Sequence, residues 1–263
     1  RMIGTLEEEL GFPLFLRNKK GVQLTENGKL MLPLLREVVR VHRNAEQFGA
    51  EICGIVKGSL SIGCYYSVSA LWMPKILTVF RARYPGVTVR MQEGGNLEMA
   101  RWLSERSVDC CFGAKPNSDV YDWLPVFRDE LVAWLPQDHP LADRPAFPLD
   151  ALQEEPFIYT SPNHDTDLDR LLAAHDLHPR TCFTTRDGFT TYNMVGAGLG
   201  VSFNQRLISR RWNGTVTEVP FDPPQFVTLG ISVPSLKEAS PAARKFIDCA
   251  IETVSAEEHL KDR

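Results

Sequence analysis

Three groups of residues in this 263-residue sequence have types and spacings that could carry chemistry. Gly196-Ala197-Gly198-Leu199-Gly200 suggests a phosphate-binding turn, His175 and His178 are separated by two residues as metal ligands can be, and Cys64 is a potential thiol nucleophile. The glycines, however, follow a predicted helix and precede a predicted strand, the reverse of the order that phosphate binding requires. They indicate a turn that ends a helix.

The histidines and Cys64 also fit structural roles better. His178 precedes Pro179 and has no third ligand nearby, so solvent-exposed side chains are expected. Nothing close to Cys64 would lower the pKa of its thiol, which favours a position in the core or a pocket wall. The sequence also lacks a nucleophile elbow, a metalloprotease histidine pair and a P-loop. We therefore expect no catalytic residue, no metal and no cofactor.

The composition is that of an ordinary globular protein, with 43% hydrophobic and 24% charged residues. No apolar run is long enough to cross a membrane, and no signal-peptide pattern opens the sequence. The six cysteines, with Cys110 and Cys111 adjacent, are too sparse for a disulfide framework. These features predict a cytoplasmic protein without a membrane partner.

Charge is distributed unevenly along the chain. The first 45 residues carry a net charge of +3 and the remainder carries −7, for a total of −4. An acidic body disfavours polyanions, so only the basic N-terminal segment is a candidate for nucleic-acid contact.

The N-terminal segment reads as a helix over 1–11, a hairpin over 12–24 with a basic tip at 17–21, and a long helix that Thr25 caps. Pro33 should kink this helix. Apolar residues recur along it in steps of three and four, as in a coiled-coil seam. The seam residues are Leu30, Leu34, Val38, Val41, Ala45, Phe48 and Ile52. Such a seam predicts pairing with a second copy of the chain.

After Gly58 the pattern changes to short strands alternating with helices, which predicts an α/β fold with a mostly parallel sheet. The strands are expected at 59–64, 87–91, 108–113, 126–135, 156–160, 181–185, 199–204 and 226–233. The helices are expected at 71–84, 97–106, 168–177, 190–197 and 241–254. Two similar α/β units in succession suggest a cleft between them.

Several motifs along the chain occur together. The pattern LE-x-x-LG-x-x-LF-x-R lies at 6–17 and LT-x-x-G at 24–28. This pair resembles the end of the winged helix-turn-helix of LysR-type transcriptional regulators. Leu71-x-x-Pro74, the string DHPLA at 138–142 and G-x-GLG at 196–200 follow in the order of the family's effector-binding region. The family pattern begins earlier, so Arg1 corresponds to a point inside the recognition helix and the first part of the winged helix-turn-helix is lacking.

The resemblance implies a fold with a partial winged helix-turn-helix, a long linker helix and a two-subdomain effector domain like that of periplasmic binding proteins. The expected divisions are 1–24 for the DNA-binding part, 25–56 for the linker helix and hinge, 57–132 for subdomain I, 133–227 for subdomain II and 228–263 for a return to subdomain I. The implied partners are double-stranded DNA, a small-molecule effector and further copies of the chain, as a dimer or tetramer. The residues expected to contact DNA are Arg1, Arg17, Lys19, Lys20 and Thr25. A solvated charged turn is the alternative for the hairpin tip.

The effector is expected where strands end, at the carboxyl edge of the sheets between the two units. Hydroxyls, amides and helix starts there favour a small organic acid. The expected contact residues are Tyr66, Ser67, Val68, Ser69, Asn96, Thr160, Ser161, Phe203 and Asn204. Trp72 is a further candidate for an aromatic wall, and the scarcity of Arg and Lys in these loops predicts modest affinity. Each Ser or Thr alone could be an ordinary helix cap.

A ligand-responsive DNA-binding regulator is thus the function that the sequence favours. A transport-type solute-binding module has the same two-unit architecture and is the alternative, and an enzyme with its active site in the cleft is a more distant one. The missing signal peptide and the basic N-terminal segment count against the transport-type module.

Overall fold

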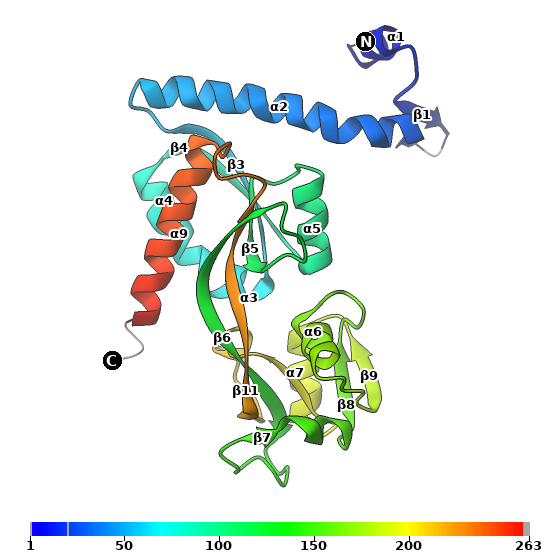
Figure 1. Ribbon diagram of the computed structural model, residues 1–263, viewed down its shortest axis with the longest axis vertical. Coiled ribbons are helices and arrows are strands. Elements are labelled where there is room, and N and C mark those ends of the chain that lie inside the picture. The colour runs from blue at the N-terminus through cyan, green and yellow to red at the C-terminus, as the bar shows by residue number, and fades with distance from the viewer. Residues whose placement is uncertain (1, 20, 260–263) are drawn as a thin grey trace.

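The computed structural model describes residues 2–19 and 21–259. The chain forms an N-terminal head, one long helix and an α/β body of two units (Figure 1). Arg1 and Lys20, both predicted to contact DNA, lie outside the described residues.

The head consists of helix α1 (Met2–Leu10) and an antiparallel hairpin of β1 (Phe15–Asn18) and β2 (Gly21–Leu24). One carboxylate oxygen of Glu7 accepts hydrogen bonds from the backbone N–H groups of Leu14 at 2.6 Å and Phe15 at 3.0 Å, which joins α1 to the hairpin. Thr25 caps the next helix as predicted, since its hydroxyl oxygen accepts from the Gly28 N–H at 2.8 Å. A Cβ on Gly28 would lie 2.2 Å from the Leu14 carbonyl oxygen, which explains the glycine of the LT-x-x-G motif.

Helix α2 (Glu26–Ile52) runs without interruption through Pro33, so the predicted kink does not divide it. One face of α2 lies on the body (Figure 1) and carries Arg36, Arg40, Arg43 and Gln47. Most of the apolar seam is displaced by two residues from these positions, about 200° around the helix, and faces away from the body. Phe48 near its end is the exception, since its ring lies 4.9 Å from the guanidinium of Arg244 in the body. Five seam residues are more than half exposed: Leu30, Leu34, Val38, Val41 and Ile52.

Unit I is built on three parallel strands, β3 (Lys57–Cys64), β4 (Gly86–Glu93) and β5 (Cys110–Ala114). Its helices are α3 (Tyr66–Leu71), α4 (Met73–Arg83), α5 (Asn96–Ser104) and α9 (Pro241–His259). The buried residues of these elements form one continuous apolar core. The return of the chain to unit I in α9 agrees with the expectation from the sequence.

Unit II contains the parallel pair β8 (Phe157–Thr160) and β9 (Thr181–Thr185), the short strands β7 (Phe147–Pro148) and β10 (Ser202–Gln205), and the 3₁₀ helix Leu149–Gln153. Its α-helices are α6 (Asp167–Ala174), α7 (Gly188–Gly196) and α8 (Arg206–Ser209). Two further groups of buried residues form its core.

Two long antiparallel strands, β6 (Asp122–Pro136) and β11 (Val216–Val233), pass through both units (Figure 1). They lie in a seven-stranded sheet of order β10-β6-β11-β5-β3-β4, with β7 paired to β11. The domain divisions expected after residues 132 and 227 fall inside these strands and stay predictions. The first half of β11, over 216–225, was not predicted as a strand.

Candidate functional site

A cavity of about 810 Å³ lies between the two units. Its lining comes from the carboxyl ends of β3, β4, β8, β9 and β10 and the helices that follow them. Both the position and the volume are those of ligand sites in open α/β folds. We refer to it as the inter-unit cavity.

Seven of the nine residues predicted to contact an effector line the inter-unit cavity. They are Tyr66, Ser67, Ser69, Asn96, Thr160, Ser161 and Asn204. The other two are placed wrongly by the sequence argument: Val68 is fully buried in the core of unit I and Phe203 in that of unit II. Phe203 points to the opposite face of β10 from Asn204, and Val68 lies about 100° around α3 from Ser67. Trp72 is likewise buried rather than part of the cavity wall.

A chain of hydrogen bonds crosses the inter-unit cavity. The Ser67 hydroxyl of unit I donates to Gln205 Oε1 at 2.9 Å, and Gln205 Nε2 donates to Asp167 Oδ2 in unit II. Nearby, the Tyr65 hydroxyl donates to Asn96 Oδ1 at 2.5 Å, and Asn96 Nδ2 donates to the Asp165 carbonyl. Gln205 and Asp167 were not identified from the sequence, because their meeting depends on how β10 and α6 pack within unit II.

Asp167 is the most deeply buried acid of this cavity, and burial raises the pKa of its carboxyl group. The nearest guanidinium, that of Arg170, forms a bidentate ion pair with Asp165 at 2.8 and 2.7 Å. The first residue of a helix is an ordinary place for an aspartate, so nothing in the sequence distinguished Asp167.

Hydroxyls on the unit II side largely bond to one another. Thr160 and Thr185 each share a hydrogen bond with the buried hydroxyl of Thr191, at 2.7 and 2.6 Å. Asp187 caps α7 by accepting from the Phe189 and Thr190 N–H groups. Burial opposes ionisation of Asp187, but the hydrogen bonds from Thr190 and Phe189 outweigh it and lower its pKa.

Arg186, between β9 and α7, also lines the inter-unit cavity and was missed by the sequence argument, which regarded basic residues as scarce there. Its side chain is exposed and makes no hydrogen bond or ion pair with any residue that the structure describes. It therefore offers a guanidinium to a ligand.

One wall of the cavity is aromatic. Phe189 is 50% exposed, and its ring lies 5.2 Å from that of Trp212 at an interplanar angle of 70°. Trp212 is held in turn by Tyr192 and Trp134 at 5.2 and 5.9 Å. This wall presents an apolar aromatic surface to the cavity, with the half-exposed Phe189 ring set on edge against Trp212.

The groups considered for catalysis have structural roles. Gly198 adopts a φ of 76° in the turn after α7, which is the helix-ending role expected of the glycine run. Cys64 is fully buried and burial raises the pKa of its thiol to about 12. Within residues 2–19 and 21–259, no cluster of His, Cys, Asp and Glu could hold a metal ion, and no helix is long and apolar enough to span a membrane.

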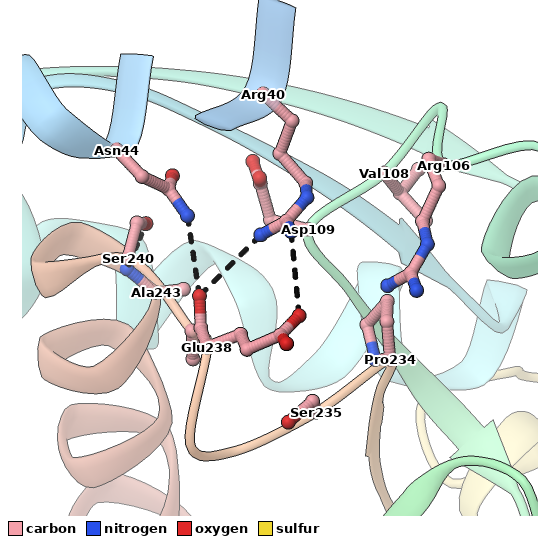
Figure 2. Close-up of a pocket in the computed structure, with 11 residues that line it drawn as sticks. Arg40, Asn44, Arg106, Val108, Asp109, Pro234, Ser235, Glu238, Ser240 and Ala243 are labelled. Atoms are coloured by element: carbon pink, nitrogen blue, oxygen red, sulfur yellow. Dashed lines mark hydrogen bonds and ion pairs between the residues drawn. The ribbon is translucent and has the colours of Figure 1, made fainter. Parts of the chain in front are cut away.

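A second, small cavity of about 20 Å³ lies where α2 meets unit I (Figure 2). Asn44 Nδ2 donates to the Glu238 carbonyl at 3.1 Å, and Arg40 reaches the Glu238 carboxylate at 3.4 Å. Arg40 is also paired with Glu37 at 2.5 Å. These contacts fasten α2 to the loop before α9.

The residues predicted for DNA contact have different surroundings in the head. Arg17 and Lys19 are exposed on and beside the hairpin, where phosphates could reach them. The Thr25 hydroxyl is bonded within the fold, since it donates to the Pro13 carbonyl at 2.8 Å and caps α2. DNA contact by these residues stays a prediction.

A family model described as the LysR substrate binding domain matches residues 54–255. The chain is also 32% identical over 264 residues to the uncharacterized HTH-type transcriptional regulator YvbU of Bacillus subtilis, covering 97% of this chain and 88% of YvbU. The chain belongs to the LysR family. It is a LysR-type transcriptional regulator with an effector-binding domain, as the sequence predicted, rather than a transport-type binding module.

Solved structures of LysR proteins share this fold. A full-length OxyR variant of Pseudomonas aeruginosa superposes with a TM-score of 0.75 at 21% identity, over 96% of this chain and 83% of OxyR. The effector-binding domain of QuiR, solved in complex with shikimate, has a TM-score of 0.66 at 19% identity, over 76% of this chain and 98% of that domain. The LysR architecture of linker helix and two-unit effector domain is thereby confirmed for this chain.

Proposed function

We propose that this LysR regulator binds a small organic acid in the inter-unit cavity and that binding alters its action on DNA. The observation that supports this proposal most directly is the cavity itself, which lies at the carboxyl ends of strands from both units. It contains the guanidinium of Arg186, which has no protein partner among the described residues. A ligand there touches both units at once, so its binding favours one relative arrangement of them. The shikimate complex of QuiR supports an acid as the effector class.

The proposed contact residues are those of the predicted set that line the inter-unit cavity, joined by Gln205, Asp167 and Arg186. Arg186 would pair with the carboxylate. The hydroxyls of Ser69 and Ser161 would join it by exchanging their present bonds to the Tyr66 and Arg186 carbonyls for bonds to the ligand. Such a site only binds and needs no catalytic residue, so we propose that the chain is not an enzyme.

The head and α2 supply the other two partners in this proposal. Arg17 and Lys19 contact DNA phosphates, which position a protein on the duplex without reading its sequence. The exposed seam of α2 pairs with a second copy of the chain, because its side chains otherwise remain in water. A protein that acts on chromosomal DNA in this way works in the cytoplasm.

A thermal-shift screen of small organic acids such as shikimate, benzoate and 3-phenylpropionate tests the effector site. A ligand that binds only the folded protein raises its melting temperature. Acids that do so should lose most of their effect in Arg186→Ala and keep it in Arg180→Ala, which removes an exposed arginine of unit II outside the cavity. Equal shifts in both variants would place the acid site elsewhere.

A further inference from the structure

A residue that lines the inter-unit cavity has one polar atom without a partner among the residues that the structure describes. Asp167 is only 8% exposed and lines the cavity. Its Oδ2 accepts from Gln205, whereas its Oδ1 is buried without a hydrogen-bond partner among the residues that the structure describes. A buried carboxylate oxygen that lacks a donor is unfavourable, and a donor on a ligand would remove that penalty.

The charge around Asp167 favours a cation as that donor. Arg170 has the nearest guanidinium, but its Nε and Nη2 atoms both donate to the Asp165 carboxylate. Its Nη1 donates to the Lys115 carbonyl at 3.0 Å. The group of Asp165, Asp167 and Arg170 therefore keeps one negative charge when its carboxyl groups are ionised. Burial raises the pKa of Asp167, and an ammonium group beside it would oppose that rise.

Other acids of the cavity lining act in the same direction. Glu93 is exposed, and Glu98 and Asp187 cap helices with carboxylates that also face the cavity. These carboxylates favour a cation in the cavity, most of all close to Asp167, whereas the guanidinium of Arg186 favours an anion beside itself.

The aromatic wall adds a requirement of shape. The ring of Phe189 is half exposed in the cavity, and Trp212 is fixed beneath it by two further aromatic rings. A flat apolar group packed on this wall would bury that exposed ring surface.

We propose that the effector carries, besides its acid group, an ammonium group that donates to Asp167 Oδ1 and a flat apolar group that packs on Phe189 and Trp212. An aromatic α-amino acid has this chemistry. The inference rests on the proposed function of the inter-unit cavity as the effector site.

Isothermal titration calorimetry of the full chain with three matched probes tests it. L-Phenylalanine carries acid, ammonium and ring, 3-phenylpropionate lacks the ammonium, and 2-phenylethylamine lacks the acid. We expect phenylalanine to bind with an affinity roughly ten-fold or more above that of 3-phenylpropionate. This ratio corresponds to the free energy of one charge-assisted hydrogen bond. Asp167→Asn should abolish that preference, and the control Glu154→Gln, which removes an exposed acid of unit II outside the cavity, should keep it.

Phe189→Ala tests the aromatic wall separately. Because the Phe189 side chain is half exposed, its removal should leave the fold intact. It should weaken phenylalanine and 3-phenylpropionate alike and leave the ratio of their affinities unchanged. If 3-phenylpropionate binds as tightly as phenylalanine to the wild-type protein, the ammonium assignment is wrong while the acid site stands. If 2-phenylethylamine binds as tightly as phenylalanine and depends on Asp167, the acid site fails and the ammonium site stands. Failure of all three probes to bind at millimolar concentration would overturn the aromatic amino acid class.

Discussion

The Ser67 hydroxyl donates a hydrogen bond of 2.9 Å to Gln205 Oε1, and this bond joins the two units across the inter-unit cavity. Both residues are buried, at 3% exposure each. Ser67→Ala leaves the Gln205 carbonyl without its donor and should lower the free energy of unfolding by about 1 kcal/mol. Chemical denaturation measures this. Ser69→Ala is the control, since the Ser69 hydroxyl bonds only to the nearby Tyr66 carbonyl in an exposed turn, and equal effects of the two changes would contradict the prediction.

Val38 lies in the α2 seam and is 67% exposed in the single chain. Val38→Asp places a charge where the proposed partner helix packs, and burial of an unpaired charge is strongly unfavourable. We expect multi-angle light scattering at micromolar concentration to show the wild-type chain as a dimer or larger and the variant as a monomer. Val120→Asp makes the same change at a valine of similar exposure, 73%, away from α2, and should leave the oligomer intact. A monomeric wild-type chain would refute seam pairing.

Gln47 fastens α2 to the body through both ends of its amide. Its Nε2 donates to the Ser59 carbonyl, and its Oε1 accepts from the N–H of Ala242 at the start of α9, each at 3.2 Å. Gln47→Ala leaves the buried Ala242 N–H unpaired, which should cost about 1–3 kcal/mol of stability. The neighbouring Glu46 is exposed, so Glu46→Ala should change the unfolding free energy by less than about 0.5 kcal/mol. The measurement is thermal or urea denaturation.

Asp129 on β6 is a buried carboxyl that accepts from the Leu207 N–H at 2.9 Å, and burial raises its pKa from 3.8 to about 6. Between these two values the folded state holds a proton that the unfolded state has lost. The contribution of this group to the free energy of unfolding is therefore fully present below about pH 4. It declines as the pH rises towards 6, by at most roughly 3 kcal/mol. The difference in unfolding free energy between wild type and Asp129→Asn should shift in favour of the variant over that range. Parallel pH profiles would show that Asp129 does not titrate in this way.

Arg17 is exposed on β1 and has the position expected for a phosphate contact. Arg17→Ala should weaken binding to a mixed-sequence DNA duplex and reduce the slope of log affinity against log salt by about 1, because fewer counterions are released. Fluorescence anisotropy over a series of salt concentrations measures both quantities. Arg180→Ala, at an exposed arginine of unit II, should change neither. An unchanged salt slope in Arg17→Ala would favour the solvated-turn alternative.

Local signals in the sequence were sufficient for most elements of the fold. The Thr25 cap, the hairpin after Gly11 and the alternation of strands and helices depend on neighbouring residues, and each is present in the structure. The first half of β11 was missed because it contains Pro220, Pro223 and Pro224, which normally argue against a strand. The register of β11 against β6 shifts between Pro220 and Gln225, and this irregularity accommodates the prolines.

The candidate site was only partly predictable. The predicted strand ends were sufficient to locate the cavity. The direction of each side chain depends on the helical or strand periodicity, which is hard to recognise in elements as short as α3 and β10, so Val68 and Phe203 were assigned wrongly. Gln205 and Asp167 are 38 positions apart and meet only after the chain has folded. Their importance follows from burial and from an unpaired oxygen, and neither can be read from a linear pattern.

The two opposite faces of α2, one fastened to unit I and one exposed for a partner, make this helix a lever. From Arg36, whose guanidinium is paired with Glu105 of unit I, to Glu26 at the head are 10 residues, or about 15 Å of helix at 1.5 Å per residue. A tilt of about 13° at the fastened end thus moves the head by roughly 3.4 Å, the step between base pairs. A modest change of angle between α2 and unit I would therefore shift the head by one step along a DNA duplex.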